Sequence, residues 1–565
     1  MRTTGVGALL QMLADAGVKY LFGNPGTTEL PLNDALVDFP RIQYILGLQE
    51  IPVMGMADGY AMAARSLGVV NLHISCGLGH AMGILYNAFR EGTPLLVTAG
   101  QQDRRLKFEE PILYGQMVEV ARPWTKWAVE VERIEDLPNA LRRAIQIALT
   151  PPTGPVFLSL PIDVQMAEAE LDLSPAAKLD CAVRPAPGAI RQAAEALLAA
   201  KNPAILAGSR VCEADAVAEL VTLAEALGAP VISEPGTTHG RLAFPADHPL
   251  YAQGLPLWSP EVRQRLHEFD VLFVTGMDLL RQYVYFEPAR PIPEQTKLVH
   301  LDEDPAQLGK NYPLEVAVLG STKAGLADLT REIQSRQSAA HREQAQQRSA
   351  RYAKAHTAAR DALRAEACRE RGRRPLTPLA LMESLARVLP DNVAVIEEAV
   401  TTTNTVFERL GALRNTTGYF GHRGWALGWG LGVALGVKLA WPDRPVLALL
   451  GEGAAMYGIQ GLWSAARYQI PVTFVICNNA QYQILKIGAG NLGLPQAEQG
   501  RYLGLDLAQP EIDFVGLAQA LGVEAQTITD PDELERQVVA SLAGNRPRLF
   551  NVPIARETPR RLNYG

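Results

Sequence analysis

An acidic residue and an amide residue stand directly after two neighbouring apolar segments in the last third of the chain. Residues 446–450 form an apolar run of strand length that ends at a Gly-Glu-Gly turn containing Glu452. Residues 472–477 form a second run, rich in β-branched side chains, that ends at the Asn-Asn pair containing Asn479. The carboxyl ends of parallel strands joined by a right-handed crossover meet at one edge of a sheet. We therefore predict that Glu452 and Asn479 lie close together.

The oxygen atoms expected at this edge are those that a hard cation prefers. The carboxylate of Glu452, the amide oxygen of Asn479 and a backbone carbonyl near Gln481 suit Mg²⁺, which keeps few protein ligands and takes others from a bound phosphate. The glycine turn also opens a helix, and a helix N-terminus attracts phosphate. The pattern predicts a Mg²⁺-diphosphate site. The alternative is a tight turn and an asparagine pair that simply end two strands.

Length and charge narrow the class of protein. A chain of 565 residues exceeds what one hydrophobic core can organise and indicates about three to four domains. With 48% apolar and 20% charged residues, the composition is that of a globular protein rather than a disordered one. The net charge of −7 and the lack of a dense basic patch argue against a nucleic-acid partner.

Cysteine usage and hydropathy point to a cytoplasmic protein. The five cysteines are scattered and odd in number, which is typical of reduced thiols rather than of a disulfide framework. The N-terminal residues do not form a cleavable leader. The most apolar stretch, 425–439, is glycine-rich and short for a membrane span, so we expect it to be a buried helix.

Apolar runs of strand length alternate with helical patterns along most of the chain. This alternation is typical of parallel sheets covered by helices on both faces. We expect strands at residues 18–22, 42–48, 69–73, 94–99, 156–160, 204–206, 230–233, 271–275, 298–301, 393–396, 446–450 and 472–477. The predicted fold class is α/β, with three doubly wound parallel-sheet domains at 1–165, 188–330 and 375–556 and a helical linker at 331–374.

The Gly-Glu-Gly turn followed at a distance by Asn-Asn resembles the fingerprint of the thiamine diphosphate (ThDP) enzymes, in which the acidic residue is aspartate. Further segments carry the resemblance across nearly the whole chain: GNPGTTELP, GLQEIPVMGMADGYA, NLHISCGLGHAMG and GHRGWALGWGLGVALG. They are more similar to the benzoylformate decarboxylase pattern than to the acetolactate synthase pattern. The resemblance implies a pyrimidine-binding first domain, a middle domain and a diphosphate- and Mg²⁺-binding last domain.

The resemblance assigns the activating carboxylate to Glu50. In the family, a glutamate in this segment bonds a nitrogen of the aminopyrimidine ring and makes the cofactor nucleophilic. Without the resemblance, Glu50 is interpreted as a carboxylate at a helix N-terminus, where the helix dipole favours it.

Three further residues are implied in catalysis. Thr27 stands where the decarboxylase pattern has a serine that holds the substrate carboxylate, and it is also placed to cap a helix. His73 stands where the pattern has a histidine that moves a proton, although a core histidine is the simpler interpretation. Tyr283 replaces a second histidine, so the proton relay is altered. His80 is interpreted as a surface residue at a helix start.

Cofactor and substrate contacts complete the set. Thr401 lies in a threonine run at a helix start, where hydroxyls and amides can hold a diphosphate or simply cap the helix. The resemblance places Leu427 beneath the bent cofactor and adds Gly453, Ala454 and Tyr482 as cofactor contacts. The residues expected to line the substrate pocket are Ile112, Leu113, His422, Ile484 and Leu485.

A dinucleotide site is not predicted. The middle domain lacks a GxGxxG turn between a strand and a helix, and the one match, at residues 488–493, does not follow a strand. We expect that match to be a flexible active-site loop. The sequence gives no positive sign of FAD.

The resemblance implies non-oxidative decarboxylation of a benzoylformate-like 2-oxo acid to an aldehyde, dependent on ThDP and Mg²⁺. A ThDP-dependent carboligase of the acetolactate synthase type is an alternative, because the replaced second histidine would slow protonation. A structural or binding homologue without catalysis is a third hypothesis, motivated by Glu452. In this family the cofactor lies between two subunits, which implies at least a homodimer and favours a homotetramer.

Overall fold

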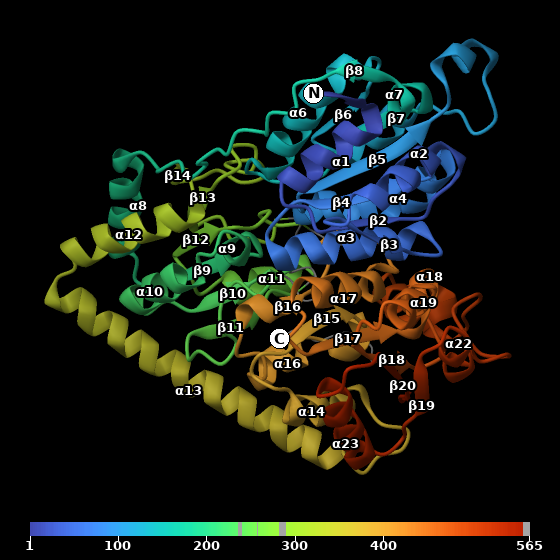
Figure 1. Cartoon of the computed structure of the whole chain (residues 1–565). Helices are drawn as coiled ribbons and strands as arrows, with labels where there is room; N and C mark the ends of the chain where they lie inside the picture. The colour runs from blue at the N-terminus through green and yellow to red at the C-terminus, as the bar shows by residue number, and fades with distance from the viewer. Residues whose placement is uncertain (235–239, 257, 282–286, 288–289, 557–565) are drawn as a thin grey trace.

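Three parallel six-stranded sheets organise the chain, which confirms the predicted α/β class. The computed structural model describes residues 1–234, 240–256, 258–281, 287 and 290–556. Figure 1 shows the N-terminal sheet and its helices above the C-terminal ones, with the middle sheet to one side.

The N-terminal sheet has the strand order β3-β2-β4-β5-β7-β6. Its strands are β2 Tyr20–Gly23, β3 Gln43–Leu46, β4 Gly68–Leu72, β5 Leu95–Gln101, β6 Trp127–Glu130 and β7 Val156–Pro161. Its helices are α1 Gly5–Asp15, α2 Leu30–Ala35, α3 Glu50–Ala64, α4 Ile74–Glu91, α5 Met117–Ala121, α6 Leu137–Leu149 and α7 Ile162–Met166. A two-stranded antiparallel ribbon, β1 Arg2–Thr4 with β8 Glu168–Glu170, joins the two ends of this domain.

The middle sheet has the order β11-β10-β9-β12-β13-β14. Its strands are β9 Pro203–Ala207, β10 Val231–Ser233, β11 Tyr251–Gly254, β12 Val271–Thr275, β13 Lys297–Asp302 and β14 Val316–Leu319. Its helices are α8 Pro187–Ala199, α9 Arg210–Glu213, α10 Val217–Leu227, α11 Ser259–Leu266 and α12 Thr322–Arg336. Buried Leu326, Leu329 and Ile333 hold α12 against this sheet.

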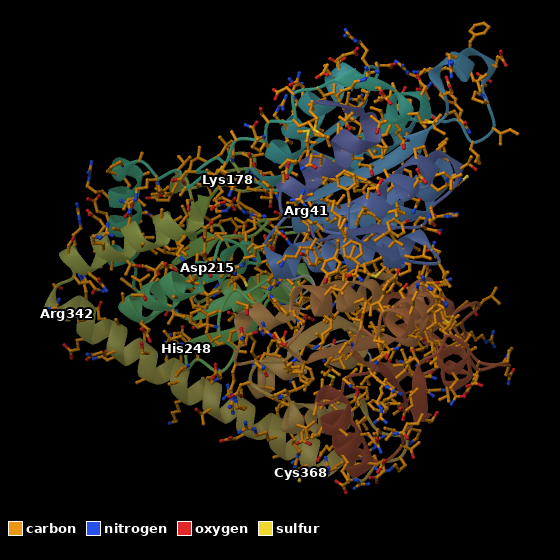
Figure 2. The ribbon with its side chains drawn as sticks, viewed as in Figure 1. Arg41, Lys178, Asp215, His248, Arg342 and Cys368 are labelled. Atoms are coloured by element: carbon orange, nitrogen blue, oxygen red, sulfur yellow. The ribbon has the colours of Figure 1, made fainter. Side chains whose placement is uncertain are left out.

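One long helix connects the middle sheet to the C-terminal sheet. Helix α13, Ala339–Glu370, has 32 residues, of which only Ala345, Leu363 and Ala367 are buried. It runs along the outside of the molecule in Figure 1, and Figure 2 places Arg342 and Cys368 near its opposite ends. No helix of the described residues combines the length and the apolarity needed to cross a membrane.

The C-terminal sheet has the order β16-β15-β17-β18-β20-β19. Its strands are β15 Ala394–Glu398, β16 Tyr419–Phe420, β17 Val446–Gly451, β18 Thr473–Asn478, β19 Glu524–Thr527 and β20 Arg548–Pro553. Its helices are α14 Pro378–Val388, α15 Val400–Thr403, α16 Val406–Leu410, α17 Trp429–Ala440, α18 Glu452–Gly458, α19 Gly461–Arg467, α20 Gln483–Asn491, α21 Pro495–Glu498, α22 Phe514–Ala520 and α23 Pro531–Leu542.

Two of the expected elements differ from the structure. The apolar helix expected at 425–439 begins only at Trp429, because Trp425 (φ 64°) and Gly428 (φ 93°) adopt left-handed backbone conformations that interrupt a helix. Residues 488–493, expected to be a loop, belong mostly to helix α20. Glycine lowers the stability of a helix but does not prevent it, so the three glycines of this segment did not produce the expected loop.

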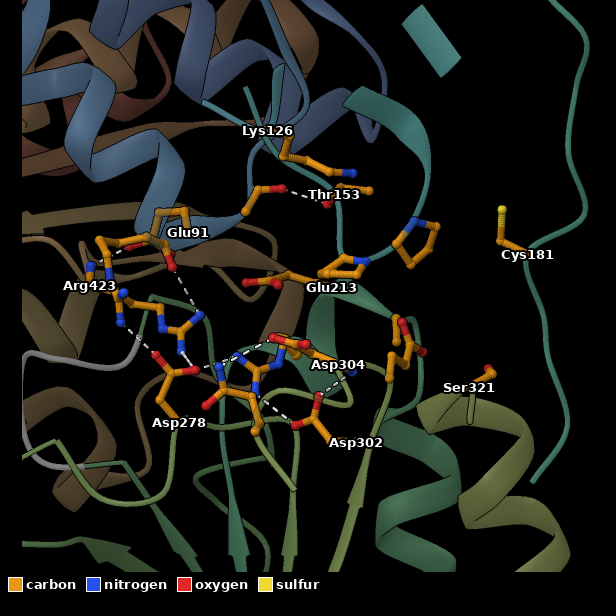
Figure 3. Close-up of a pocket in the computed structure, with 18 of the residues that line it drawn as sticks. Glu91, Lys126, Thr153, Cys181, Glu213, Asp278, Asp302, Asp304, Ser321 and Arg423 are labelled. Carbon is orange, nitrogen blue, oxygen red and sulfur yellow. Dashed lines mark hydrogen bonds and ion pairs between the residues drawn. The ribbon is translucent and has the colours of Figure 1, made fainter. Parts of the chain in front are cut away.

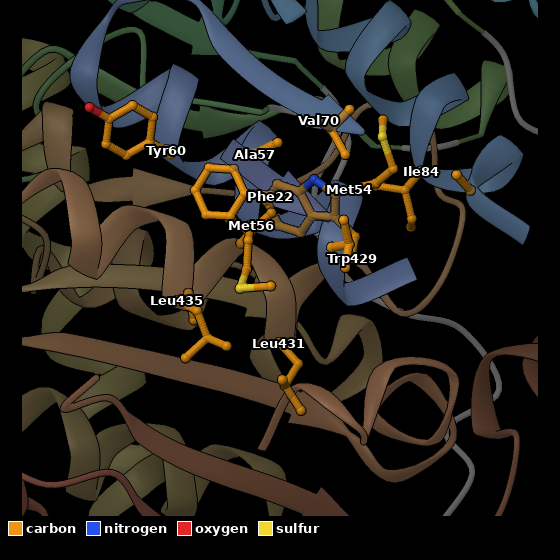
Figure 4. Close-up of a cluster of buried hydrophobic side chains, with 14 of the residues drawn as sticks. Phe22, Met54, Met56, Ala57, Tyr60, Val70, Ile84, Trp429, Leu431 and Leu435 are labelled. Carbon is orange, nitrogen blue, oxygen red and sulfur yellow. The ribbon is translucent and has the colours of Figure 1, made fainter. Parts of the chain in front are cut away.

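The N-terminal and C-terminal domains share one hydrophobic core, centred on the crossing of α3 and α17. Figure 4 shows Met54, Met56 and Tyr60 of α3 beside Leu431 and Leu435 of α17, all buried. The backbones approach closely because glycines stand at the crossing. A Cβ atom on Gly432 would lie 2.6 Å from the carbonyl oxygen of Pro52, and one on Gly436 would overlap the carbonyl oxygen of Met56. Trp429 also donates an indole N–H to Asp58 over 2.6 Å.

We predict that Gly436→Ala destabilises the protein by about 1–3 kcal/mol, because the added methyl overlaps backbone that cannot move aside independently. The matched control is Gly488→Ala, also within a helix, where a Cβ meets no atom within 4 Å. Alanine there favours the helix by up to about 1 kcal/mol. Thermal unfolding of both variants checks the prediction, and equal melting temperatures would contradict it.

Candidate functional site

The predicted metal ligands meet at the edge of the C-terminal sheet. Strands β17 and β18 are parallel neighbours, and Glu452 and Asn479 follow their carboxyl ends. The backbone N–H of Gln481 donates to Glu452 Oε1 (3.0 Å) and to Asn479 Oδ1 (3.2 Å). The three residues are buried. A single N–H therefore holds the carboxylate and the amide oxygen side by side.

The charge at this edge is suited to a cation. Burial raises the pKa of Glu452, while N–H groups of Gln481 and Asn479 oppose the shift. Within the described residues, the carboxylate of Glu452 makes no salt bridge, whereas the nearby Lys486 ammonium bonds the side chains of Gln481 and Asp506. The charge of Arg556 also lowers the pKa of Glu452, and a carboxylate buried without a salt bridge can be stabilised by a bound metal. Clusters of three or more histidine, cysteine or acidic side chains that could hold a metal are absent from the described part of the chain.

The proposed cofactor contacts surround this edge. Gly453 lies against the ring of Tyr482, where a Cβ would approach to 2.6 Å, and Ala454 follows in helix α18. Thr401 is half-buried in the short helix α15. Leu427, in the loop before α17, keeps 36% of its surface exposed although its neighbours are packed. Leu427 is thus the exposed apolar side chain among these predicted contacts.

A buried glutamate holds the loop that carries Leu427. Glu398 Oε1 accepts N–H bonds from Gly428 (2.9 Å) and Trp429 (3.0 Å), and its Oε2 accepts one from Gly430 (2.9 Å). Asn87 of α4 fixes the other side of the loop, since it both donates to and accepts from the backbone of Ala426. Leu427 thus stands between two anchors, one from each outer domain.

Glu50 begins helix α3 and lies with its carboxylate against helix α4. It is 4% exposed. Asn24 donates its amide N–H to Glu50 Oε1 over 3.2 Å, and His80 Nδ1 lies 3.0 Å from Glu50 Oε2. Glycine at position 77 allows this approach, because a Cβ there would lie 3.1 Å from Glu50 Oε1. The predicted catalytic carboxylate is therefore buried, and among the described residues two side chains bond it.

His73 is paired with a second buried glutamate. His73 Nδ1 lies 2.8 Å from Glu29 Oε2, and the backbone N–H of Gly26 donates to the same oxygen. Glu29 Oε1 accepts bonds from Gly100 N–H and the Thr28 hydroxyl. Thr27, one residue after Gly26, is exposed beside the pair. A hydroxyl and an imidazole held by a carboxylate can together bind an anion and transfer a proton.

The residues expected to line the substrate pocket differ widely in how much of their surface is exposed. Ile112 (85% exposed) and Leu113 (37% exposed) lie on an open loop, and Leu485 is also exposed. Ile484 is half-buried. His422 is fully buried with its ring 5.4 Å from that of Trp429, and burial lowers its pKa to about 4. It is therefore a neutral core histidine. Tyr283 lies outside the described residues.

The single chain brings the predicted residues together as two separate groups. The hydrogen-bond partners of the Glu50 carboxylate are side chains of the N-terminal domain, and the partner of the Glu452 carboxylate is a backbone N–H of the C-terminal domain. Their elements are tied through α3 and α17, since a Cβ on Gly428 would lie 3.0 Å from Ile51 Cγ2. Thr27 in the first group and Leu427 near the second keep exposed surface.

A cavity of about 470 Å³ lies elsewhere, between the three domains, and none of the predicted site residues lines it. Figure 3 shows its charged wall, with Arg423 of the C-terminal domain, Glu91 of α4 and Asp278 of the middle domain. Arg423 lies 3.3 Å from Asp278, and its backbone N–H donates to Glu91. Burial would raise the pKa of Asp278, but Arg423 and Arg210 lower it below its usual range. These charges join the domains at the cavity.

Sequence reasoning missed the residues that support the predicted ones. Glu29, Asn24 and His80 hold or approach the catalytic candidates, and Glu398 holds the loop of Leu427. One signal was available: His80 follows His73 by seven residues, which is about two turns into the helix that begins at Ile74. The bonds of Glu398 depend on tertiary structure and leave no pattern of spacing.

Comparison with known proteins covers nearly the whole chain. The N-terminal TPP-binding domain of the thiamine pyrophosphate enzymes matches residues 3–112, their central domain matches 190–329, and their C-terminal TPP-binding domain matches 400–552. Benzoylformate decarboxylase of Pseudomonas aeruginosa is 34% identical over 550 residues, which are 97% of this chain and 98% of that protein. A probable acetolactate synthase large subunit of Methanocaldococcus jannaschii is 27% identical over 97% of this chain and 92% of that protein.

A solved structure is also similar throughout. The ThDP-dependent 4-hydroxybenzoylformate decarboxylase of Rhodococcus jostii superposes with a TM-score of 0.85 at 29% identity, covering 99% of this chain and 100% of that one.

We predict that Glu398 makes stability depend on pH. Burial raises its pKa to about 7, although three N–H bonds favour the charged form. Because the folded pKa exceeds the unfolded value of about 4.3, this contribution to stability is fully present below about pH 4.3 and is lost as the pH rises through about 7. Glu398→Gln does not titrate. As the pH rises, the unfolding free energy of this variant should therefore fall less steeply than that of the wild type. The two slopes should differ by at most about 1.4 kcal/mol per pH unit.

Urea denaturation of the two proteins between about pH 5 and about pH 7 measures this difference. The exposed Glu498 supplies the control, since Glu498→Gln should keep the wild-type slope. Equal slopes for the wild type and Glu398→Gln would refute the assignment.

Proposed function

The chain belongs to the thiamine diphosphate-dependent enzymes, and from that premise we propose that it decarboxylates a benzoylformate-like 2-oxo acid to an aldehyde. The observation that carries the proposal is the pair of His73 with Glu29, beside the exposed hydroxyl of Thr27. When the carboxylate leaves as CO₂, the carbon that carried it keeps the electron pair of the broken bond and must gain a proton, and a partly exposed imidazole paired with a carboxylate suits that transfer. Benzoylformate decarboxylase, at 34% identity, supports the choice of an aromatic substrate.

ThDP, when bound, supplies the electron sink that allows the bond to the carboxylate to break. In our proposal Glu50 holds the nitrogen of its pyrimidine ring, and the burial of Glu50 keeps that bond free of water. Thr27 orients the substrate carboxylate, and His73 delivers the proton to the carbon that CO₂ leaves. We assign no step to Tyr283.

Mg²⁺ would be held by the Glu452 carboxylate, the Asn479 amide oxygen and the Gln481 carbonyl. Glu452 is a longer side chain than aspartate, and the N–H of Gln481 holds it close to Asn479. Thr401, Leu427, Gly453, Ala454 and Tyr482 would contact the cofactor. We further propose that the pyrimidine ring is received by domain 1–165 and the diphosphate by domain 375–556, with 188–330 and the linker 331–374 as a scaffold.

We propose that two chains complete the site and that the protein is at least a homodimer, with a homotetramer as the fuller assembly. Phe108 is 99% exposed and Ile112 85% exposed on one protruding loop, and Leu503 is 98% exposed in the C-terminal domain. Burying such side chains stabilises an association by about 25 cal/mol per Å². A second copy would also cover the surface that both residue groups leave exposed. The free state of all five cysteines supports a reducing, cytoplasmic location.

A carboligase is the second candidate, favoured by the similarity to acetolactate synthases. It would use the same activated cofactor. It would join the acyl fragment that remains after CO₂ loss to the carbonyl carbon of a second compound. A non-catalytic homologue is the third candidate, and its distinguishing property would be a lack of Mg²⁺-dependent ThDP binding.

We predict that the purified protein, given ThDP, Mg²⁺ and benzoylformate, releases CO₂ and benzaldehyde in equal amounts, and that chelating the metal stops the reaction. Glu50→Gln should lower kcat at least about 100-fold, because the ring nitrogen loses its proton-sharing partner. Chromatography of the products and a CO₂ assay give the measurement.

Ligation products as the main outcome, with added aldehyde or pyruvate, would replace the decarboxylase by the carboligase. Calorimetry without ThDP binding would favour the non-catalytic homologue.

We predict that Phe108→Glu weakens the association of chains and lowers activity in proportion, because it places a charge on the face that a second copy covers. Val539→Glu is the control, since Val539 is 49% exposed on α23 at the edge of the C-terminal domain. Analytical ultracentrifugation at several protein concentrations compares the two variants with the wild type. A wild type that sediments as a monomer would contradict the proposal.

A further inference from the structure

One face of helix α4 presents two histidines to two buried carboxylates. His73 precedes the helix as its N-cap, and His80 follows two turns later on the same side. His73 Nδ1 lies 2.8 Å from Glu29 Oε2, and His80 Nδ1 lies 3.0 Å from Glu50 Oε2. The helix turn between them carries a glycine, so the carboxylate of Glu50 can lie directly against the helix.

The two carboxylates differ in how firmly they are held. Glu29 accepts two backbone N–H bonds, from Gly26 and Gly100, in addition to bonds from Thr28 and His73. The donors to the carboxylate of Glu50 in the described structure are side chains, the amide of Asn24 on Oε1 and the imidazole of His80 on Oε2. The orientation of Glu50 therefore depends on His80 in a way that the orientation of Glu29 does not depend on His73.

We propose that His80 is a positioning residue for Glu50. Its Nδ1–H donates to Oε2 and fixes the rotamer of the carboxylate, so that Glu50 meets the pyrimidine ring in one orientation; this inference rests on the proposed function. The side chain of His80 is itself 61% exposed, so it contributes little to the packed core. Its contact with Glu50 is the feature of its surroundings that can affect the cofactor.

The atom that makes the contact allows a sharp test. The side-chain nitrogen of asparagine is bonded to Cγ, as Nδ1 of histidine is, so His80→Asn keeps a donor at the same distance from the backbone. His80→Gln moves the donor one atom further out, and His80→Ala removes it. A role in orienting Glu50 predicts rescue by asparagine only.

The first measurement is the dissociation constant of ThDP in the presence of Mg²⁺, by calorimetry on the full-length protein. A lost hydrogen bond to a charged group corresponds to a weakening of about tenfold or more. We expect about tenfold weaker binding for His80→Ala and His80→Gln, and binding within about twofold of the wild type for His80→Asn. Decarboxylation of benzoylformate should follow the same order in kcat, with KM for the acid unchanged.

The second measurement repeats the comparison in Glu50→Gln. If His80 acts through Glu50, adding His80→Ala to Glu50→Gln should change the dissociation constant less than about twofold, and the melting temperature of the cofactor-free protein should be equal for all His80 variants. Asparagine as weak as alanine, alanine as tight as the wild type, or an equal loss in both backgrounds would overturn the proposal. ThDP binding without decarboxylation would refute only the proposed reaction, whereas a wild type that does not bind ThDP would refute both.

Discussion

The close contact between helices α3 and α17 is the constraint on which the site depends. Glu50 is the first residue of α3, and Leu427 stands just before α17. Gly432 and Gly436 let the two backbones touch, so the starts of the two helices are fixed relative to one another. A larger residue at the crossing would separate the domains and would shift the carboxylate and the leucine together. The relative position of Glu50 and Leu427 is thus set by glycines at a helix crossing several residues away from both.

Buried carboxylates are the second organising feature, and each is stabilised in a different way. Glu398 is held by three backbone N–H groups, and burial still raises its pKa to about 7. Asp58, whose pKa burial raises to about 6, accepts the indole N–H of Trp429. Both lie in the shared core and act as structural anchors. Glu452 and Glu50 are also buried, but each begins a helix that follows a sheet strand and accepts few hydrogen bonds in the described structure. The same residue type therefore serves structure or chemistry according to what can approach it.

The sequence predicted the architecture well because its signals were local. Alternating apolar runs and glycine turns indicated parallel sheets, and the strand ends brought Glu452 to Asn479 as expected. Helix starts were predicted less well. The apolar run at 425–439 continues unbroken through Leu427. Glu398, some 30 residues earlier, accepts hydrogen bonds from three successive backbone N–H groups at 428–430, and the helix therefore begins at Trp429. Such long-range bonds have no periodicity from which they could be predicted.

The same limit explains the residues that were missed or placed differently. His422 follows a sheet strand and was expected to face the substrate; in the single chain its ring lies beside that of Trp429, and burial lowers its pKa to about 4. The next residue, Arg423, is instead drawn toward Asp278 of the middle domain and Glu91 of α4. One loop thus contributes a core residue, a link among three domains and, at Leu427, an exposed apolar side chain. Arg423 holds one end of this loop through Asp278 and Glu91, and Glu398 holds the other end through the backbone, so Leu427 lies between two fixed points. The wall of charges at the interdomain cavity is therefore part of what keeps Leu427 in place.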